Sequence, residues 1–499
     1  MAGRVRIAAT AAVLLAVCMA AQAAPPRQDS RQHAQAEARA QLAALRAARD
    51  PFADVYAVTS RATFDGLDGT LHALAKRRDA TGAELVVSRV RAHALGEVSA
   101  YIHEQERRCG GYFAFATRAQ AEAFVRGDRS AQAIAGKALA SYAIDNQATV
   151  SRWLPQVAEP NLRATIAHLQ GYQNRWYASA TGVESAQWIR DRWQALAGPR
   201  TDVSTELFTA CGNCGGQPSV ILTIAGVETP GEVLVLGAHL DSINRNGGGA
   251  TQRAPGADDD ASGIAVLTET LRIALASGWR PQRNVKVMGY AAEEVGLRGS
   301  NAIAQAHRNA GSNVVGVLQV DMTNYKSGAV PDMRLVTDYS NAELKTFFAA
   351  LFDAYLAPMG LVRGTDTCGY ACSDHASWTA AGYPAAMMFE AGDPGGAFPY
   401  IHTTSDTLAT MGDTATHSVK FAQFALAFLG ELAKTTAIPP MSGNLPPELV
   451  RTPAPSPGAA PSQPSRATGQ NARPREARAV REGVSRPLRS GSRPRSSVP

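Results

Sequence analysis

Hydrophobic and polar positions follow two kinds of pattern between residues 144 and 437. Short apolar runs predict strands, whereas longer stretches with apolar residues at helical spacing predict helices. The expected strands are Ser219–Ala225, Val233–Ala238, Val285–Ala292, Val314–Val320, Met333–Val336 and Pro384–Phe389, and the expected helices are Ile264–Leu275, Ala342–Tyr355 and Val419–Leu432. Strands that alternate with helices indicate crossover connections and parallel pairing. We therefore expect an α/β domain whose mostly parallel central sheet is flanked by helices.

The remaining parts of the chain differ from this domain in texture. Residues 1–23 combine a charged start, an apolar run and the ending Ala21-Gln22-Ala23, which is the pattern of a secretory signal peptide. A short buried helix and a lipoprotein signal at Cys18 are the alternatives. Residues 24–143 mix helical and strand-like spacing without a cluster of catalytic residue types, so we expect a small α+β module, either a propeptide or an accessory domain. Residues 438–499 are rich in Pro, Arg and Ser and poor in aliphatic residues, which predicts a disordered tail.

The net charge of +6 raises the question of a nucleic-acid partner. Residues 451–499 alone hold ten arginines and two glutamates, so the rest of the 499-residue chain is slightly negative. After residue 23 there is no uncharged apolar run of about 18 residues, the length that a membrane-spanning helix needs. We therefore expect neither a nucleic-acid partner nor a membrane partner.

Acidic and imidazole side chains follow three of the expected strands. The second, third and fourth strands are followed by His239 and Asp241, by Glu293 and Glu294, and by Asp321. Ligands of open α/β sheets bind beyond the carboxyl ends of the strands. These side chains are therefore expected to share one site.

Two further segments extend this group. The run Asp258-Asp259-Asp260 precedes an expected helix, and three adjacent acids repel one another unless a cation or a helix N-terminus compensates their charge. A solvated acidic turn is the alternative for this run taken alone. His402 lies in a segment rich in hydroxyl side chains, Tyr400–Asp406. A lone histidine is usually structural, so we interpret His402 as a ligand only together with the other residues.

Two histidines with several carboxylates favour a first-row divalent metal, zinc above all. The surplus of carboxylates suggests two metals that share a bridging acid. Glu293 and Glu294 point in different directions as sequence neighbours, so one could bind metal while the other acts as a general base. The chain has no Gly-x-Ser-x-Gly motif, no His-Glu-x-x-His motif and no phosphate-binding glycine-rich loop, so the corresponding chemistries lack support.

Four of the six cysteines form close pairs in the sequence, Cys211 with Cys214 and Cys368 with Cys372. In a secreted chain each pair could close a small disulfide loop. A zinc site built from both pairs is the alternative, although about 150 residues separate them. A disulfide in the second pair would stiffen the loop that carries Tyr370.

Six longer motifs occur in this part of the chain. They are Gly-Ala-His239-Leu-Asp241-Ser, Ala-Pro-Gly-Ala-Asp-Asp259-Asp-Ala-Ser-Gly, Tyr-Ala-Ala-Glu293-Glu294-Val-Gly-Leu-Arg-Gly-Ser, Leu-Gln-Val-Asp321-Met-Thr-Asn-Tyr, Asp-Thr-Cys368-Gly-Tyr-Ala-Cys372-Ser-Asp-His and Ile-His402-Thr-Thr. In matching order over residues 144–433, they resemble the motifs of the secreted bacterial leucyl aminopeptidases, which are two-zinc exopeptidases on an α/β sheet. The resemblance implies a secreted, monomeric metalloaminopeptidase that removes large apolar first residues such as Leu from peptides with a free N-terminus.

The resemblance also implies roles for single residues. Asp259 would bridge two zinc ions, His239 and Asp321 would complete one metal site, and Glu294 and His402 would complete the other. Glu293 would be the general base, and Tyr370 would stabilise the developing oxyanion. Asp241 would orient His239 from behind the metal, and a cis peptide bond would precede Asp260. A pocket for the first side chain of the substrate would be lined by Met322, Met387, Phe389, Phe398 and Ile401. The stretch 391–400 departs from the family pattern, which leaves the rim of this pocket open.

The segment that begins Arg108-Cys-Gly-Gly-Tyr-Phe resembles the propeptide of the same family. This implies that residues 24–143 act as an intramolecular inhibitor or folding aid and that residues 144–437 form the mature catalytic domain. The C-terminal tail is a departure from relatives that carry a folded domain there. Another zinc exopeptidase or a glutaminyl cyclase on the same fold, a catalytically inactive binding module and a calcium-stabilised adhesion domain are the alternative interpretations.

Overall fold

The computed structural model describes residues 52–67, 69–78, 84–106, 111–127, 142–246, 249–328, 330–368, 371–390 and 398–435. The expected signal peptide, residues 1–23, and the expected disordered tail, residues 438–499, lie outside this part of the chain. Within it, no helix is both long enough and apolar enough to cross a membrane. We call residues 52–127 the N-terminal module and residues 142–435 the main domain.

The N-terminal module is a four-stranded antiparallel sheet packed against helices. Its elements are β1 (Asp54–Ser60), α2 (Arg61–Gly66), β2 (His72–Arg78), β3 (Glu84–Arg91), α3 (Leu95–Glu104), β4 (Tyr112–Phe115) and α4 (Arg118–Gly127). The strand order β2-β3-β1-β4 places Val58 of β1 opposite both Val87 and Phe113, and all three side chains are buried. The mixture of strands and helices agrees with the α+β module that the sequence predicts.

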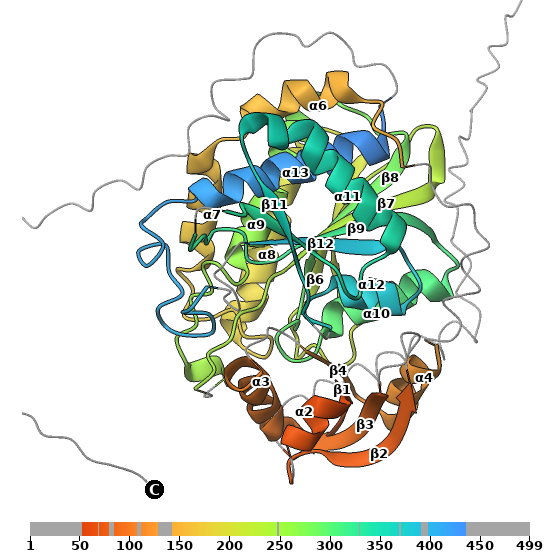
Figure 1. The fold of residues 1–499 in the computed structure, drawn as a ribbon, viewed down its shortest axis with the longest axis vertical. Coiled ribbons are helices and arrows are strands. Elements are labelled where there is room, and N and C mark those ends of the chain that lie inside the picture. Colours follow the sequence, from red (N-terminus) through yellow and green to blue (C-terminus); the bar gives the residue numbers. More distant parts are fainter. Residues whose placement is uncertain are drawn as a thin grey trace, which may run out of the picture. The chain divides into compact units, whose positions relative to one another are not determined.

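An eight-stranded sheet forms the centre of the main domain (Figure 1). Its strands are β5 (Val203–Phe208), β6 (Ser219–Ile224), β7 (Thr229–His239), β8 (Arg283–Tyr290), β9 (Asn313–Val320), β10 (Met333–Val336), β11 (Arg363–Asp366) and β12 (Ala385–Glu390). They lie in the order β11-β10-β12-β9-β7-β8-β6-β5. The central pairs β7 with β8, β7 with β9 and β9 with β12 are parallel, as is β10 with β11. The pairs β5 with β6, β6 with β8 and β10 with β12 are antiparallel, so the sheet is mostly parallel, as expected.

All six expected strands are confirmed, with bounds that differ by a few residues. β7 begins at Thr229 rather than Val233; its first four residues, Thr-Pro-Gly-Glu, are mostly exposed and form no apolar run that could have predicted them as strand. β5 and β11 were not predicted from the sequence. They lie at the two edges of the sheet, where most of their side chains are half-buried or exposed, so neither strand has a continuous apolar run.

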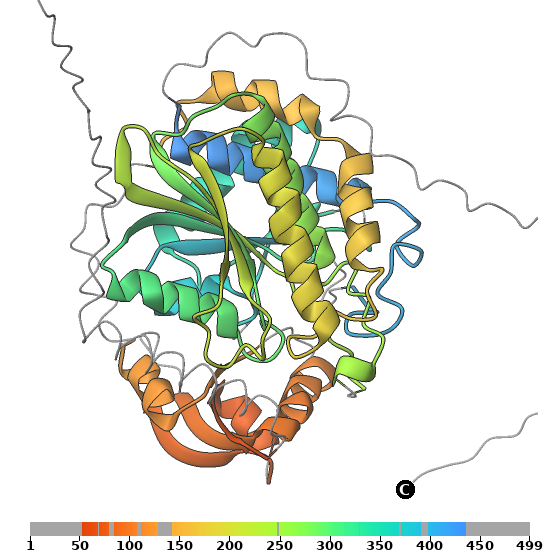
Figure 2. The same ribbon diagram turned by 180° about the vertical axis from the view of Figure 1, so that it is seen from behind.

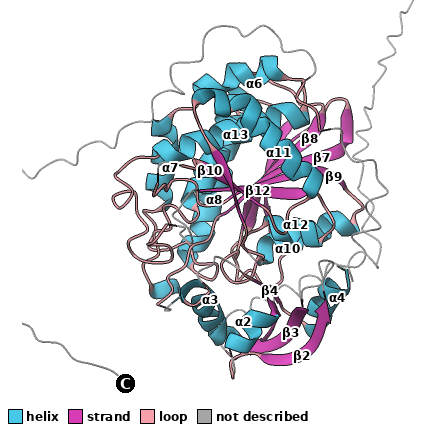
Figure 3. Cartoon of the chain, in the orientation of Figure 1, coloured by secondary structure: helices cyan, strands magenta, loops and turns pink. Residues whose placement is uncertain are grey.

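Helices cover both faces of the sheet (Figures 1, 2 and 3). They are α6 (Gln147–Trp153), α7 (Glu159–Leu169), α8 (Ala180–Ala197), α9 (Ala261–Ala276), α10 (Arg298–Asn309), α11 (Ala342–Tyr355), α12 (His375–Ala380) and α13 (Thr416–Ala433). Leu236 packs in one core cluster with α9, α11 and α13, whereas Val235 packs in another with α10 and α12. Because neighbouring residues of a strand point to opposite faces, these two groups of helices lie on opposite sides of the sheet. The three expected helices are confirmed as α9, α11 and α13.

Candidate active site

Three neighbouring strands bring the acidic and imidazole side chains to one edge of the sheet. His239 is the last residue of β7, and β8 and β9 lie on either side of it. Glu293 and Glu294 follow β8 by a few residues, and Asp321 follows β9 directly. The strands are parallel here, so their carboxyl ends meet, as the sequence led us to expect.

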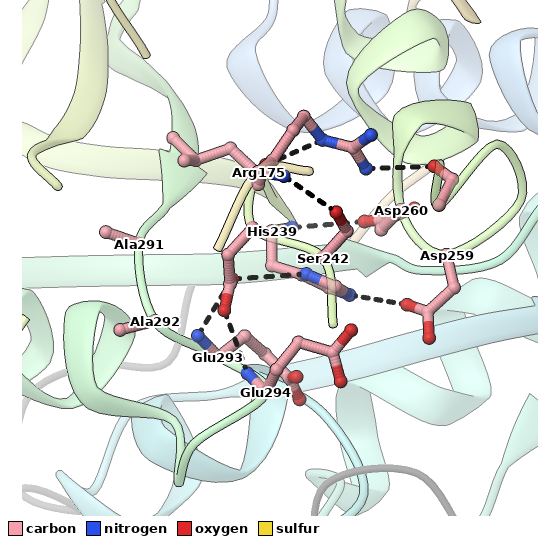
Figure 4. Close-up of polar contacts among 12 residues, drawn as sticks. Arg175, His239, Ser242, Asp259, Asp260, Ala291, Ala292, Glu293 and Glu294 are labelled. Carbon is pink, nitrogen blue, oxygen red and sulfur yellow. Dashed lines mark hydrogen bonds and ion pairs between the residues drawn. The ribbon is translucent and has the colours of Figure 1, made fainter. Parts of the chain in front are cut away.

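The structure arranges five of these side chains in two groups that could each hold a metal ion. One group is His239, Asp259 and Asp321, and the other is Asp259, Glu294 and His402; in each group the ligand atoms lie within 4.8 Å of one another. His239 Nε2 is 2.8 Å from Asp259 Oδ1 (Figure 4). His402 Nε2 is 2.6 Å from Asp259 Oδ2 and 2.8 Å from Glu294 Oε2. Asp259 thus offers one oxygen to each group, which is the arrangement that a bridging ligand needs.

The residues of both groups fit a pair of divalent cations. Glu294 Oε1 and Asp321 Oδ1 are buried and accept no hydrogen bond. A buried carboxylate oxygen without a donor costs free energy, and a bound cation removes that cost. Imidazole nitrogen with carboxylate oxygen is a donor set that zinc accepts.

Burial and mutual charge set the pKa values of the site without metal. Burial raises the pKa of Glu294 to about 7, and the neighbouring Asp259 charge adds to this rise. Burial opposes the protonation of His402, yet the charges of Glu294 and Asp259 raise the pKa of its imidazole to about 10. Burial also raises the pKa of Glu293 well above its ordinary value. Without metal, a proton on His402 therefore compensates part of the negative charge of Glu294 and Asp259.

Asp260 joins the three elements that carry the first metal group. Its Oδ1 accepts hydrogen bonds from the N–H of Gly263 at 2.8 Å and of Met322 at 3.2 Å, and its Oδ2 accepts one from the N–H of His239 at 3.1 Å. The first of these bonds caps α9, a contact that is worth about 1 kcal/mol in helices generally. The peptide bond between Asp259 and Asp260 is cis, as the resemblance implies.

Asp241 lies behind His239 but has a second set of partners. Its Oδ1 is 3.4 Å from His239 Nδ1. The same oxygen accepts a hydrogen bond from the N–H of Glu293 at 2.9 Å, and Oδ2 accepts one from the N–H of Glu294 at 3.3 Å. Asp241 therefore also fixes the loop that carries both glutamates, a contact that its sequence position did not reveal.

Two residues without a predicted role, Asp406 and Ser373, form hydrogen bonds to the residues of the two ligand groups or to their neighbours. Asp406 accepts hydrogen bonds from the N–H of Asp258 at 2.8 Å and of Asp259 at 3.2 Å. The hydroxyl of Ser373 donates to Asp321 Oδ2 at 2.6 Å. Asp406 closes the hydroxyl-rich segment around His402, and that proximity was the one available signal for it.

The remaining predicted site residues have different outcomes. Tyr370 lies outside the described residues, so its role as an oxyanion donor stays a prediction. Both cysteine pairs form disulfides, Cys211 with Cys214 and Cys368 with Cys372, rather than a zinc site.

The five residues expected to line the substrate pocket do not form a single apolar cluster in the part of the chain that the structure describes. Met387 and Phe389 pack with Cys372 and with side chains of the N-terminal module. Phe398 is buried against Tyr325 and Tyr400. Met322 is buried and Ile401 half-buried, and the stretch 391–397 between these groups lies outside the description. The pocket therefore stays a prediction.

Known proteins resemble this chain in sequence and in fold. Residues 219–427 match the model of Peptidase family M28. A probable leucine aminopeptidase of Arthroderma otae is 33% identical over 294 residues, which cover 58% of this chain and 78% of that protein. Leucine aminopeptidase 1 of Coccidioides posadasii is 34% identical over 304 residues, with 58% of this chain and 75% of that protein covered.

Two crystal structures from Legionella pneumophila share the fold. LapA aminopeptidase is 27% identical with a TM-score of 0.63 and covers 77% of this chain and 99% of its own. LapB is 28% identical with a TM-score of 0.65 and covers 76% of this chain and 99% of its own. The main domain, residues 142–435, is a smaller part of the chain than the 76–77% that these two structures cover. The structural similarity therefore extends into the N-terminal module. The chain therefore belongs to peptidase family M28 and is a zinc-dependent aminopeptidase.

Proposed function

We propose that this chain is a secreted aminopeptidase that uses two zinc ions to remove large apolar residues, such as Leu, from the N-termini of peptides. The observation that carries the proposal is the position of Asp259, whose two oxygens face two separate buried ligand groups. The two disulfides and the signal-like residues 1–23 support an extracellular or periplasmic location.

Glu293 is the proposed general base of the reaction. Its side chain is buried beside the two ligand groups, and its Oε1 has no hydrogen-bond partner (Figure 4). Bound zinc would supply Lewis acidity, which polarises the scissile carbonyl and lowers the pKa of the attacking water. The Glu293 carboxylate takes the proton of that water and holds it beside the scissile bond. It then passes the proton to the leaving amine nitrogen.

The preference for an apolar first residue rests on a smaller set of contacts. Met387 and Phe389 lie on β12, which pairs directly with β9, the strand that leads to Asp321. Phe398 lies four residues before His402, and its N–H donates to Glu390 Oε1 at 3.0 Å, at the end of the same strand. Apolar side chains along this strand and next to its end would favour a substrate side chain of similar character. The relatives named leucine aminopeptidases agree with this preference.

The test of the proposed function is hydrolysis of leucine p-nitroanilide by the secreted, processed protein. We expect activity to be lost on chelation and restored by added zinc. Nα-acetyl-leucine p-nitroanilide is the matched control, because its blocked amine should prevent cleavage by an aminopeptidase. If the protein binds two zinc ions and leaves the free-amine substrate intact, the proposal is wrong. Cyclisation of an N-terminal glutamine or cleavage at the C-terminus would then indicate the alternative activities on this fold.

We further propose that the N-terminal module is an intramolecular inhibitor of this site. The Ser99 hydroxyl donates to the carbonyl oxygen of Glu294 at 3.1 Å. The N–H of Ala114 in β4 donates to the carbonyl oxygen of Gly296 at 3.1 Å. Apolar side chains of the module pack in one cluster with Met387, which belongs to the predicted substrate pocket. The module thus covers the loop of the proposed base and one wall of the predicted pocket.

Release of the N-terminal module is therefore expected to raise activity. An engineered protease site within residues 128–141 would separate the module from the main domain without changing either. Ala114→Arg should act in the same direction, because Ala114 is buried at the contact with Gly296. His72→Arg on exposed β2 is the control and should leave activity unchanged. Equal activity of the intact, cut and Ala114→Arg proteins would show that the module does not inhibit.

A further inference from the structure

Arg175 is a fully buried arginine that the proposed mechanism does not use (Figure 4). Its side chain is 1% exposed, and it lies between α7 and α8, before the residues that match the family model. Burying a guanidinium is costly unless its N–H groups find acceptors, so its partners indicate why it is placed there.

The Arg175 guanidinium donates hydrogen bonds to carbonyl oxygens of three separate segments. Nε donates to Leu240 at 2.9 Å, and Nη2 donates to Gly256 at 2.9 Å. Nη1 donates to Pro255 at 2.6 Å and to Leu169 at 3.3 Å. Each of these acceptors is a main-chain carbonyl and none is a carboxylate. The side chain therefore fastens backbone segments together.

Two of the fastened segments carry metal ligands. Leu240 is next to His239, and Gly256 lies three residues before Asp259. The main chain of Arg175 strengthens the same connection, because its N–H donates to Ser242 Oγ at 3.0 Å and that hydroxyl donates to the Ala254 carbonyl at 2.8 Å. One residue thus holds the end of β7 against the segment that leads to Asp259.

We propose that Arg175 is a positioning residue for the metal centre. By fixing these two segments it sets the 2.8 Å separation of His239 Nε2 and Asp259 Oδ1 and so raises the affinity of the site for zinc. This inference rests on the proposed metal site. The planar guanidinium suits the task because its N–H groups spread in fixed directions from three nitrogens, whereas a lysine ammonium holds its three donors on a single nitrogen.

Charge and geometry predict opposite effects of removing Arg175. The buried cation lies near Asp406, Asp260 and Asp241, whose charges act on it. A positive charge behind the ligands repels a bound cation, so loss of the charge alone would tighten zinc binding. Loss of the hydrogen bonds would weaken it. We expect the loss of the hydrogen bonds to outweigh the loss of the charge, so that removing Arg175 weakens zinc binding.

The experiment is a competition titration of the metal-free full-length protein with zinc against a chromophoric chelator. Arg175→Lys keeps the charge, and Arg175→Met removes both the charge and the hydrogen bonds. We expect both variants to bind zinc about 10- to 100-fold more weakly, the range found when residues supporting metal ligands are changed. Arg272→Lys is the matched control, because Arg272 Nη2 also donates to a carbonyl, that of Gln156 at 2.7 Å, but lies far along α9 from the ligands.

A second variant keeps the test decisive if Arg175 variants fold poorly. Ser242→Ala removes one link of the same connection and should weaken zinc binding in the same direction by a smaller factor. Zinc affinity of Arg175→Lys within about threefold of wild type, or tighter binding by Arg175→Met, would overturn the proposal. The unfolding midpoint of each metal-free variant is compared with that of Arg272→Lys. A similar midpoint shows that weaker zinc binding does not come from a general loss of stability. A wild-type protein that binds no zinc would instead overturn the proposed function, and this inference with it.

Discussion

Glu293→Gln is expected to lower kcat for leucine p-nitroanilide by about 10²- to 10⁴-fold, the usual contribution of a general base. Glutamine fills the same volume, but its amide cannot accept the proton of the attacking water. The main-chain N–H of Glu293 keeps its bond to Asp241, so the loop should hold its position. Because Glu293 is not part of either ligand group, zinc stoichiometry should stay at the wild-type value.

A matched control separates loss of the base from loss of a buried acid in general. Glu269 is also buried, and its carboxylate pairs with Arg272 on the same helix, α9. Glu269→Gln should reduce stability but leave kcat near the wild-type value. Comparable losses of kcat in both variants, or near-normal turnover by Glu293→Gln with two zinc ions bound, would contradict the role of Glu293 as base.

The sequence predicted the central fold well because buried strands have a strong local signal. The apolar runs of β6 to β9 identify strands without reference to their neighbours, and α9 and α13 are almost entirely buried. The edge strands β5 and β11 lack this signal, since pairing along one side and partial exposure leave their composition mixed. The antiparallel outer pairs are likewise set by tertiary packing and not by local pattern.

Ligand residues could be predicted where they follow a strong strand. His239 and Asp321 adjoin β7 and β9, so their place at the sheet edge follows from topology alone. Arg175 could not be found in this way, because it follows no strand and acts through carbonyl oxygens that have no sequence signature. Asp406 is similar, since it holds the main chain of Asp259 across a long sequence separation.

The pocket is the part of the site that the sequence predicted least well. Apolar side chains serve a core, an interface and a substrate pocket equally well, so their type does not distinguish these uses. Met387 shows the difficulty, because it packs in one cluster with side chains of the N-terminal module. A side chain that lines the pocket of a free main domain can thus be part of a buried interface in the full chain.

Asp258 and Asp259 are neighbours in the run of three aspartates, but only Asp259 belongs to the ligand groups, so substitutions of the two residues test the assignment of the bridging ligand. Asp259 takes part in both ligand groups, so Asp259→Asn removes the charge that both cations share. We expect this variant to lose at least one zinc ion, counted by metal analysis after dialysis, and its activity to fall to that of the chelated enzyme. Added zinc should not restore it, because the amide offers only one oxygen, and that oxygen is uncharged.

Asp258→Asn is the control, one residue away. Asp258 Oδ1 accepts a hydrogen bond from the N–H of Asn324 at 2.8 Å, and the asparagine carbonyl can accept the same bond. Asp258 belongs to neither ligand group, so the substitution leaves the ligand atoms of both groups in place. We expect two zinc ions and most of the activity to remain. The reverse result, with Asp258→Asn inactive and Asp259→Asn retaining both zinc ions, would mean that the bridging ligand has been assigned to the wrong aspartate.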